Sequence, residues 1–267
     1  MGKATALAHA PELFKLLSND IRWNILMLLA RSDSSGLELV RSLKQPQNLI
    51  SYHIRLLVEQ QLVSERRSSA DERLAYYSLN LETLRFLYTT SGESLHPVLH
   101  VPELLEGERG PMGSYLAMQA VRVLFLCTHN SARSQIAEGA LRALSGGRIE
   151  VASGGSHPTQ LHPLAVQAMH TLGMDIGHQH SKHLREFTGQ TFDYVITVCD
   201  RVRESCPAFP GDPERIHWSF PDPAEAEGDE EERSQIFELT ARQLMTRIRY
   251  FLLLIEREHA RPHQHVV

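Results

Sequence analysis

Val-Leu-Phe-Leu-Cys-Thr-His-Asn-Ser-Ala-Arg-Ser, residues 123–134, determines the architecture of the C-terminal half of this 267-residue chain. An apolar strand, residues 121–126, runs through a short polar loop into a segment with apolar residues at helical spacing, namely Ile136, Ala137, Ala140 and Leu141. A strand, a loop and a helix in this order are typical of an α/β fold. Successive N–H groups of the loop and the positive end of the helix dipole would form a cradle for an oxyanion.

Two residues of this stretch indicate a nucleophile that attacks a bound anion. Cys127 would lie at the bottom of the cradle, where positive surroundings stabilise a thiolate near neutral pH. Arg133 supplies a planar, two-pronged donor to a tetrahedral oxyanion. The other residues of the expected anion-binding loop are Thr128, His129, Asn130, Ser131, Ala132 and Ser134, of which Asn130 braces the loop and Ser134 donates to the thiolate. Cysteine and arginine at this spacing also occur by chance, and the alternative is a buried cysteine beside a surface arginine.

The other two cysteines lie in the same half of the chain. Cys199 ends a second apolar strand, residues 192–199, and Cys206 follows in a polar segment closed by Pro207 and Pro210. A nucleophile and two further thiols are the minimum set for a disulfide relay, in which one thiol attacks, one resolves and one passes the oxidation on. The alternative is that Cys199 is a small buried apolar residue, as free cysteines often are.

An aspartate lies between two prolines in His217-Trp-Ser-Phe-Pro-Asp-Pro-Ala224. Because Pro221 and Pro223 fix φ and stiffen the loop, Asp222 is held in place and could protonate a leaving oxygen above the cradle. Without the other residues of the site, a simple turn aspartate would be the better interpretation.

Taken together, these motifs make residues 120–258 similar to the thioredoxin-coupled arsenate reductases, which have the low-molecular-weight tyrosine phosphatase fold. The matching stretches are residues 127–139, Ala152-Ser-Gly-Gly155, Val198-Cys-Asp200 with Cys206, and residues 217–224. The resemblance implies an α/β domain with a four-stranded parallel sheet. It also implies that arsenate is the substrate, that no cofactor is bound and that thioredoxin is the electron donor.

The resemblance further implies a role for each matching residue. Cys127 attacks arsenate held by Arg133 and the loop, and Asp222 is the general acid. Cys199 then attacks Cys127 and releases arsenite, and Cys206 takes over to give a Cys199–Cys206 disulfide that thioredoxin reduces.

One position departs from the family pattern. Some members bind potassium through an asparagine, a glutamate, a serine and an aspartate. Asn130, Glu138 and Ser153 match these ligands, but Lys182 stands at the aspartate position. We therefore expect no metal, with the Lys182 ammonium in the place of the ion.

A tyrosine phosphatase of the same fold is the main rival, because the cradle, Cys127, Arg133 and Asp222 would serve phosphate esters equally well. A phosphatase needs no resolving thiols, and Ala224, where such phosphatases carry an aromatic residue, leaves nothing to stack on a phenol ring.

The first 92 residues have a different character. They contain no cysteine and hold eleven Lys and Arg against nine Asp and Glu, whereas the whole chain has a net charge of −5. A polyanion would therefore meet the N-terminal half. We expect a domain at residues 1–92, a Gly- and Pro-rich linker at 93–119, the reductase domain at 120–258 and a tail at 259–267. The longest apolar run near the end, residues 250–255, is too short to cross a membrane, and a cytoplasmic protein is expected.

Helical periodicity in residues 11–60, followed by a hairpin at 62–79, predicts a winged helix-turn-helix domain. Asp20 is expected to cap the second helix. A solvated polar face is the alternative to DNA binding. The residues expected to contact DNA are Gln47, Asn48, Ser51, Tyr52 and Arg55 on a helix and Arg66, Arg67 and Arg73 in the hairpin.

Residues 51–63 resemble the recognition helix of ArsR-type repressors, which implies a homodimer on a two-fold double-stranded DNA operator. Gln61 replaces the glycine usual at the end of that helix, at a local cost. Residues 37–41 carry no sulfur ligand for arsenite, so this domain cannot sense arsenite alone. The whole chain is therefore predicted to fuse a DNA-binding regulator to an arsenate reductase. Its second domain could also serve as an arsenic or redox sensor.

Overall fold

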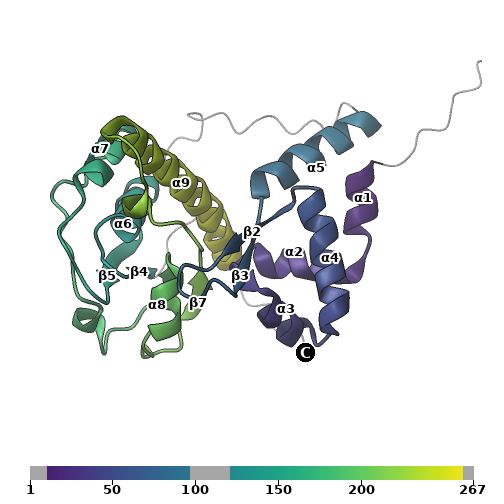
Figure 1. The fold of residues 1–267 in the computed structure, drawn as a ribbon, viewed down its shortest axis with the longest axis horizontal. Helices are drawn as coiled ribbons and strands as arrows, with labels where there is room; N and C mark the ends of the chain where they lie inside the picture. Colours follow the sequence, from purple (N-terminus) through teal and green to yellow (C-terminus); the bar gives the residue numbers. More distant parts are fainter. Residues whose placement is uncertain (1–10, 97–120, 261–267) are drawn as a thin grey trace, which may run out of the picture. The chain divides into compact units, whose positions relative to one another are not determined.

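The structure is a computed structural model that describes residues 11–96 and 121–260 (Figure 1). These residues form two compact units, the first of residues 11–67 and 73–96 and the second of residues 68–72 and 121–260. Most of the expected linker 93–119 and tail 259–267 lies outside the described residues. Every helix in the described ranges is too short or too polar to span a bilayer.

The first unit combines helices with a small antiparallel sheet. Its elements are α1 (Glu12–Leu17), α2 (Asp20–Leu29), β1 (Ser34–Ser35), α3 (Gly36–Leu43), α4 (Gln47–Glu59), β2 (Val63–Arg67), β3 (Ala75–Leu79) and α5 (Leu81–Leu95). Strand β3 lies between β1 and β2 and pairs antiparallel with both. The two expected hairpin strands are therefore present, and the Ser34–Ser35 pairing is an addition that two residues are too short to signal in a sequence.

Local chemistry sets the ends of these helices. The side chain of Asn19, not that of Asp20, accepts the backbone N–H groups of Ile21 and Arg22, so the expected Asp20 cap is wrong by one position. A reciprocal capping box between Ser35 and Glu38 begins α3. Residue 61, just beyond α4, has φ of 56°, which is the left-handed conformation that would favour glycine.

The second unit is a four-stranded parallel sheet covered by helices, as expected. Its elements are β4 (Arg122–Cys127), α6 (Arg133–Leu144), β5 (Glu150–Gly155), α7 (Pro163–Thr171), η2 (Leu184–Phe187), β6 (Tyr194–Thr197), α8 (Asp200–Ser205), β7 (Glu214–His217), η3 (Pro223–Glu225) and α9 (Glu230–Ala260). The strand order is β5-β4-β6-β7 and all three pairings are parallel. The carboxyl ends of the strands therefore share one edge, where sites of open α/β sheets form.

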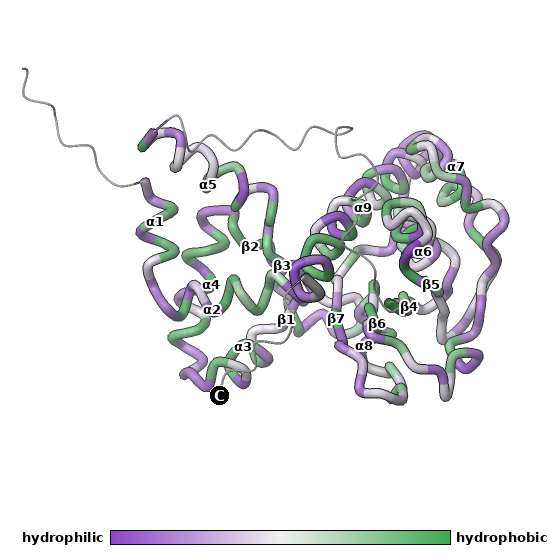
Figure 2. The backbone as a smooth tube through the Cα atoms, turned by 180° about the vertical axis from the view of Figure 1, so that it is seen from behind, coloured by the Kyte–Doolittle hydropathy of each residue, from purple (hydrophilic) through white to green (hydrophobic). Residues whose placement is uncertain are grey.

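Burial of the two central strands explains their apolar sequences. Residues 123–127 of β4 and all of β6 are buried, and Figure 2 colours most of β4 as hydrophobic. Helix α6 packs against β4, β5, α7 and α9, whereas α8 packs against β4 and β6. The helical spacing of apolar residues in 232–258 predicts a packing stripe on α9 that includes Leu239, Leu244, Ile248 and Leu252. The last three are buried as predicted, but Leu239 is 55% exposed and does not belong to the stripe.

Candidate active site

The loop between β4 and α6 wraps around the sulfur of Cys127. Cys127 is the last residue of β4, and its Sγ accepts the Asn130 N–H at 3.1 Å and lies 2.9 Å from Ser134 Oγ. Helix α6 begins at Arg133, and no side chain caps its N-terminus at Ala132. The first N–H groups of α6 are thus not used by a capping side chain, which suits an anion.

Close backbone packing gives the loop its shape. Asn130 has φ of 47°, a left-handed conformation that asparagine tolerates better than most residues. Gly155 ends β5 beneath the loop, and a Cβ there would lie 2.7 Å from the Thr128 carbonyl oxygen and 2.9 Å from the Asn130 nitrogen. The loop can approach the sheet this closely only because residue 155 is glycine.

Asn130 braces the loop from inside, as the sequence predicts. Its Nδ2 donates to Ser134 Oγ at 2.9 Å and to Ser153 Oγ at 2.8 Å, and its Oδ1 accepts the Lys182 N–H at 2.7 Å. Gln135 Nε2 donates to the Asn130 carbonyl oxygen at 3.0 Å. This amide therefore ties the loop to α6, β5 and residue 182.

Arg133 is buried and contacts the segment that follows β7. Its Nη1 donates to the Phe220 carbonyl oxygen at 2.8 Å, and its Nη2 forms an ion pair with the Asp222 carboxylate. The two side chains are only 5% and 11% exposed. An oxyanion that uses the same face of the guanidinium must compete with this carboxylate.

The protonation of Cys127 differs from the expectation. Burial raises the pKa of the Cys127 thiol above its ordinary value, and the neighbouring Cys199 raises it further. Arg133, the Ser134 hydroxyl and the Asn130 N–H oppose this rise without cancelling it. The physical reason is that the sulfur lies out of water, where its charged form is disfavoured.

The structure brings two of the three cysteines together. Cys199 is buried, its Sγ lies 3.3 Å from Thr128 Oγ1 in the anion loop, and it is close enough to Cys127 to affect the pKa of that thiol. Cys206 follows the opposite end of α8. A helix rises about 1.5 Å per residue, so the Cα atoms of Cys199 and Cys206 are about 10 Å apart, beyond the span of about 7 Å that a disulfide allows.

Cys206 is partly buried, and its Sγ lies 3.7 Å from the carbonyl oxygen of Pro207. Burial raises the pKa of this thiol, and the nearby Arg215 opposes the rise. Cys206 is thus held apart from Cys199 and is the more accessible thiol.

The remaining loop residues bind neighbouring segments through their backbones. The carbonyl oxygen of His129 accepts the Thr159 N–H and that of Ser131 accepts the His162 N–H, each at 2.9 Å. Ala132 is buried. The backbones of His129 and Ser131 thus fix the loop against residues 159–162.

Sequence reasoning did not predict the contacts of two polar groups near the cysteines, the buried Asp200 and the partly buried Ser181. Asp200, the first residue of α8, lies 3.1 Å from His217 Nε2 through its Oδ1 and accepts a hydrogen bond from Ser219 Oγ at 2.7 Å. Ser181 Oγ donates to the Asn130 carbonyl oxygen at 2.7 Å. Because these partners are far apart in the sequence, no local pattern could have signalled them.

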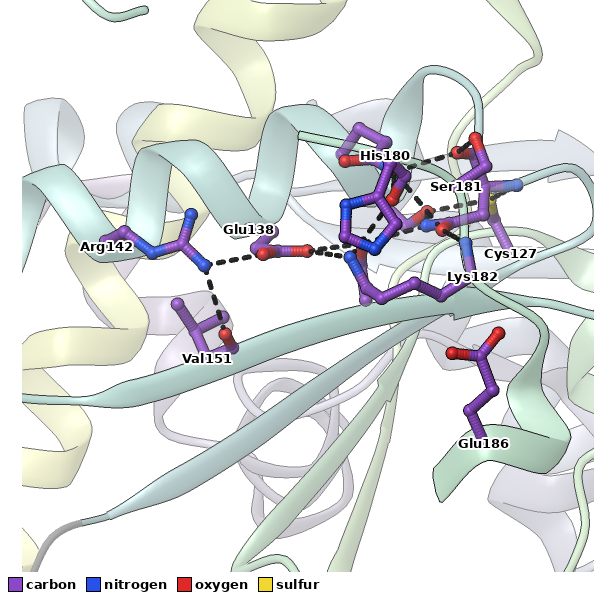
Figure 3. Close-up of polar contacts among 12 residues, drawn as sticks. Cys127, Glu138, Arg142, Val151, His180, Ser181, Lys182 and Glu186 are labelled. Atoms are coloured by element: carbon purple, nitrogen blue, oxygen red, sulfur yellow. Dashed lines mark hydrogen bonds and ion pairs between the residues drawn. The ribbon is translucent and has the colours of Figure 1, made fainter. Parts of the chain in front are cut away.

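Lys182, whose ammonium is expected to take the place of a potassium ion, lies beside Glu138. Lys182 Nζ lies 3.4 Å from Glu138 Oε2 and donates to the His180 carbonyl oxygen at 3.1 Å (Figure 3). Among the residues that the structure describes, no group of three or more His, Cys, Asp and Glu could hold a metal ion. That the ammonium takes the place of the ion stays a prediction.

Five of the residues expected to contact DNA share one face of α4. This face is exposed and lies opposite the buried Ile50, Ile54 and Leu57. Its residues are Gln47, Asn48, Ser51, Tyr52 and Arg55. Arg66 and Arg67 lie on β2, and Arg73 lies in the turn before β3.

The family model of the low molecular weight phosphotyrosine protein phosphatases matches residues 122–261. The chain belongs to this family. Within it, the chain is similar to the arsenate reductases of Halalkalibacterium halodurans and Shouchella clausii, with 40% identity to each over 129 residues, 48% of this chain and 93% of each enzyme. A solved structure, described as an arsenate reductase in the phosphate binding state, is 28% identical with a TM-score of 0.42 and covers 51% of this chain and 98% of that one.

These relatives support an arsenate reductase and confirm the expected resemblance for the C-terminal half of the chain. The first unit lies outside the residues that the family model matches. Its DNA-binding role stays a prediction.

Proposed function

We propose that the second unit reduces arsenate to arsenite by a relay of three cysteines. The observation that carries the proposal is the placement of two thiols at one anion-binding loop. Cys127 lies within the loop, and Cys199 lies against its Thr128 hydroxyl. A phosphatase needs only the first thiol, whereas a reductase needs the second so that two thiols together supply two electrons to arsenic.

The chemistry follows from these positions. The Cys127 thiolate attacks arsenic(V) of an arsenate held by Arg133 and the loop N–H groups, and one oxygen leaves as water with a proton from Asp222. The Cys199 thiolate then attacks Cys127 Sγ. The sulfur–arsenic bond breaks, its electron pair stays on arsenic, and arsenite leaves. Arsenic gains two electrons, and the two thiols lose two as the Cys127–Cys199 disulfide forms.

Cys206 completes the cycle. Its thiolate attacks Cys199, which frees the Cys127 thiolate and leaves a Cys199–Cys206 disulfide. Since α8 holds the two residues apart, this step requires α8 to unwind. The dithiol of thioredoxin, which we propose as the reductant, would then reduce the disulfide.

The test is arsenate-dependent oxidation of NADPH in the presence of thioredoxin and thioredoxin reductase. Wild type is expected to turn over repeatedly. Cys206→Ser is expected to release about one arsenite per chain and stop, because its disulfide cannot be passed on. Full steady turnover in Cys206→Ser, or no arsenite from folded wild type, would contradict the relay.

A tyrosine phosphatase remains the second candidate, because the matching family model carries that name. Hydrolysis of an aryl phosphate separates the two functions. If the protein is a reductase, wild type is expected to hydrolyse the aryl phosphate only weakly. Replacement of Cys199 and Cys206 should leave this hydrolysis unchanged but abolish arsenate turnover. Fast hydrolysis without arsenate turnover would favour the phosphatase.

We further propose that the first unit is a winged helix-turn-helix domain of the ArsR type that binds double-stranded DNA as a homodimer. The support is the succession of α3 and α4, the β2–β3 hairpin and the exposed polar face of α4. In this arrangement α4 enters the major groove, and Arg67 and Arg73 approach phosphates.

Selection of duplexes from a random library by the full chain, followed by fluorescence anisotropy, tests this role. Arg55→Ala is expected to weaken binding to the selected duplex by about 1–3 kcal/mol, and binding should fall steeply with salt. Glu82→Ala on α5 is the matched control. If the folded chain enriches no duplex, the DNA-binding role is wrong.

A further inference from the structure

A buried carboxylate next to Cys199 has no part in the proposed chemistry. Asp200 is the first residue of α8 and is fully buried. Its Oδ1 lies 3.1 Å from His217 Nε2 and accepts from Ser219 Oγ at 2.7 Å. Ser69, which belongs to the same unit, donates its N–H and its hydroxyl to Oδ2 at 2.9 and 3.1 Å. A carboxylate is costly to bury unless hydrogen bonds compensate it, and here both of its oxygens accept them.

The histidine that contacts Asp200 is itself fixed on the sheet. His217 is the last residue of β7 and is 2% exposed, and its Nδ1 lies 2.9 Å from the Oγ1 of Thr197, the last residue of β6. Because a carboxylate only accepts, the hydrogen between Asp200 and His217 is on Nε2. Both nitrogens of the ring are thus occupied, and the ring joins the start of α8 to the carboxyl ends of two strands.

The two ends of α8 differ in how they are held. A helix of six residues is too short to be stable in isolation, so contacts with the sheet must hold it in place. Asp200 and Val202, near its first end, are buried, whereas Cys206, just beyond its last residue, is partly exposed. This distribution of contacts favours unwinding from the Cys206 end.

The proposed relay requires one end of α8 to stay and the other to move. Cys199 must remain near Cys127 to form the first disulfide, and it is bonded to Cys127 when Cys206 attacks. A helix that lifted from its first residue would carry Cys199 away from the anion loop before either disulfide could form.

We infer that Asp200 is a positioning residue, which holds Cys199 at the anion loop through His217 while α8 unwinds from its Cys206 end. One short helix can then keep one thiol in place and deliver another. The inference rests on the proposed function in that it takes the three thiols to act as a relay. Which end of α8 unwinds can nevertheless be measured without arsenate.

Oxidation of the full-length Cys127→Ser protein provides this measurement. The chain has three cysteines, so this variant retains only Cys199 and Cys206 as thiols. The azo oxidant diamide takes up two electrons and two protons from them and becomes a hydrazine, and the Cys199–Cys206 disulfide forms. If the disulfide does not form in the folded protein, the Cys206 end does not unwind as inferred and the inference is wrong.

Nuclear magnetic resonance of the His217 imidazole then shows which end of α8 has moved. The protein carries isotope-labelled histidine, and His217→Gln in the same background assigns the Nε2–H signal. A buried N–H that donates to Asp200 is expected to exchange slowly with water in the reduced protein. The same signal should persist after the disulfide forms. Its loss on oxidation, or its absence from the reduced protein, would overturn the inference.

Asp200→Asn tests the hold on Cys199 itself. In a Cys206→Ser background, it is expected to slow the single-turnover release of arsenite about tenfold, because a hydrogen bond to a charged group is stronger than one to a neutral amide. Alkylation of Cys127 by iodoacetamide in Cys199→Ser/Cys206→Ser should be unaffected by the same change. Asp175→Asn, which alters an exposed turn of the same unit, is the matched control and should change neither rate.

Ser219→Ala removes one donor to the carboxylate if Asp200→Asn does not fold, and slower arsenite release is again expected. Unchanged release in a folded Asp200→Asn or Ser219→Ala protein would overturn the inference. Equal slowing of arsenite release and of Cys127 alkylation would overturn it as well, because the damage would then extend to the whole site. No arsenite from wild type would contradict the proposed function but not the resonance result.

Discussion

At the scale of single residues, the ion pair between Arg133 and Asp222 is the contact on which anion binding depends. Both side chains are mostly buried, so their attraction is little screened by water. The carboxylate that is proposed to deliver a proton also holds the guanidinium that is proposed to receive the substrate. Binding and acid catalysis are therefore linked through one side chain.

Asp222→Asn is expected to lower kcat for arsenate by about 10²–10⁴, because the general acid is lost. The same change should tighten inhibition by phosphate several-fold, because the guanidinium is no longer paired with a carboxylate. Steady-state kinetics with phosphate as a competitive inhibitor measure both. Glu225→Gln, three residues away and exposed, is the control. Weaker phosphate inhibition in Asp222→Asn would contradict this linkage.

The pKa of Cys127 gives a second prediction at this scale. An unfolded cysteine has a pKa of about 8.5. Because burial raises the pKa of Cys127, its thiolate fraction should continue to increase at pH values where an unfolded cysteine is already fully ionised. Alkylation of the Cys199→Ser/Cys206→Ser protein as a function of pH measures this. Removal of Cys199 should lower the midpoint but leave it above the ordinary value, since burial is the larger cause. A midpoint below that of free cysteine would contradict the prediction.

At the scale of elements, the join between β5 and the anion loop is the tightest contact of the site. Gly155→Ala would place a methyl group 2.7 Å from a backbone oxygen of the loop and 2.9 Å from a backbone nitrogen. Since neither atom can turn away as a side chain does, the loop must shift.

We expect Gly155→Ala to lower the free energy of unfolding by about 1–3 kcal/mol and to impair arsenate turnover more strongly than stability. Urea unfolding and the coupled NADPH assay measure the two effects. Gly177→Ala, whose Cβ would meet the movable side chain of Asp175 at 3.2 Å, is the control. Normal turnover in Gly155→Ala would show that the loop tolerates displacement.

At the scale of the whole molecule, a redox enzyme and a predicted DNA-binding unit share one chain. The proposed Cys199–Cys206 disulfide requires α8 to unwind, so oxidation changes the surface of the second unit. The first unit carries no cysteine of its own. A redox signal could reach DNA only through the second unit.

DNA affinity of the full chain is therefore expected to differ between the reduced and the oxidised protein. Anisotropy with the selected duplex, before and after one round of arsenate reduction in the absence of thioredoxin, measures the difference. Cys206→Ser should show no such difference if the second disulfide is the signal. Identical DNA affinities of reduced and oxidised wild type would show that DNA binding does not depend on the redox state of the cysteines.

Patterns within about ten residues were enough to predict an α/β fold, the anion loop with Cys127 and Arg133, and the hairpin of the first unit, whereas the four-stranded parallel sheet was implied by the family resemblance. Apolar periodicity, glycine and proline positions and motif spacing are all local properties of a chain. The same patterns placed Leu239 in the core and the α2 cap at Asp20. Packing against other elements instead leaves Leu239 exposed, and a one-residue difference in backbone geometry makes Asn19 the cap of α2.

Only the tertiary structure decided which residues of the site contact one another. The Arg133–Asp222 pair, the placement of Cys199 against Thr128 and the contact between Asp200 and His217 join residues far apart in the sequence. Their strength depends on burial, which removes competing water and raises the pKa of the Cys127 thiol. A sequence states which groups are present, whereas their distances and their exclusion from water arise only when the sheet and helices assemble.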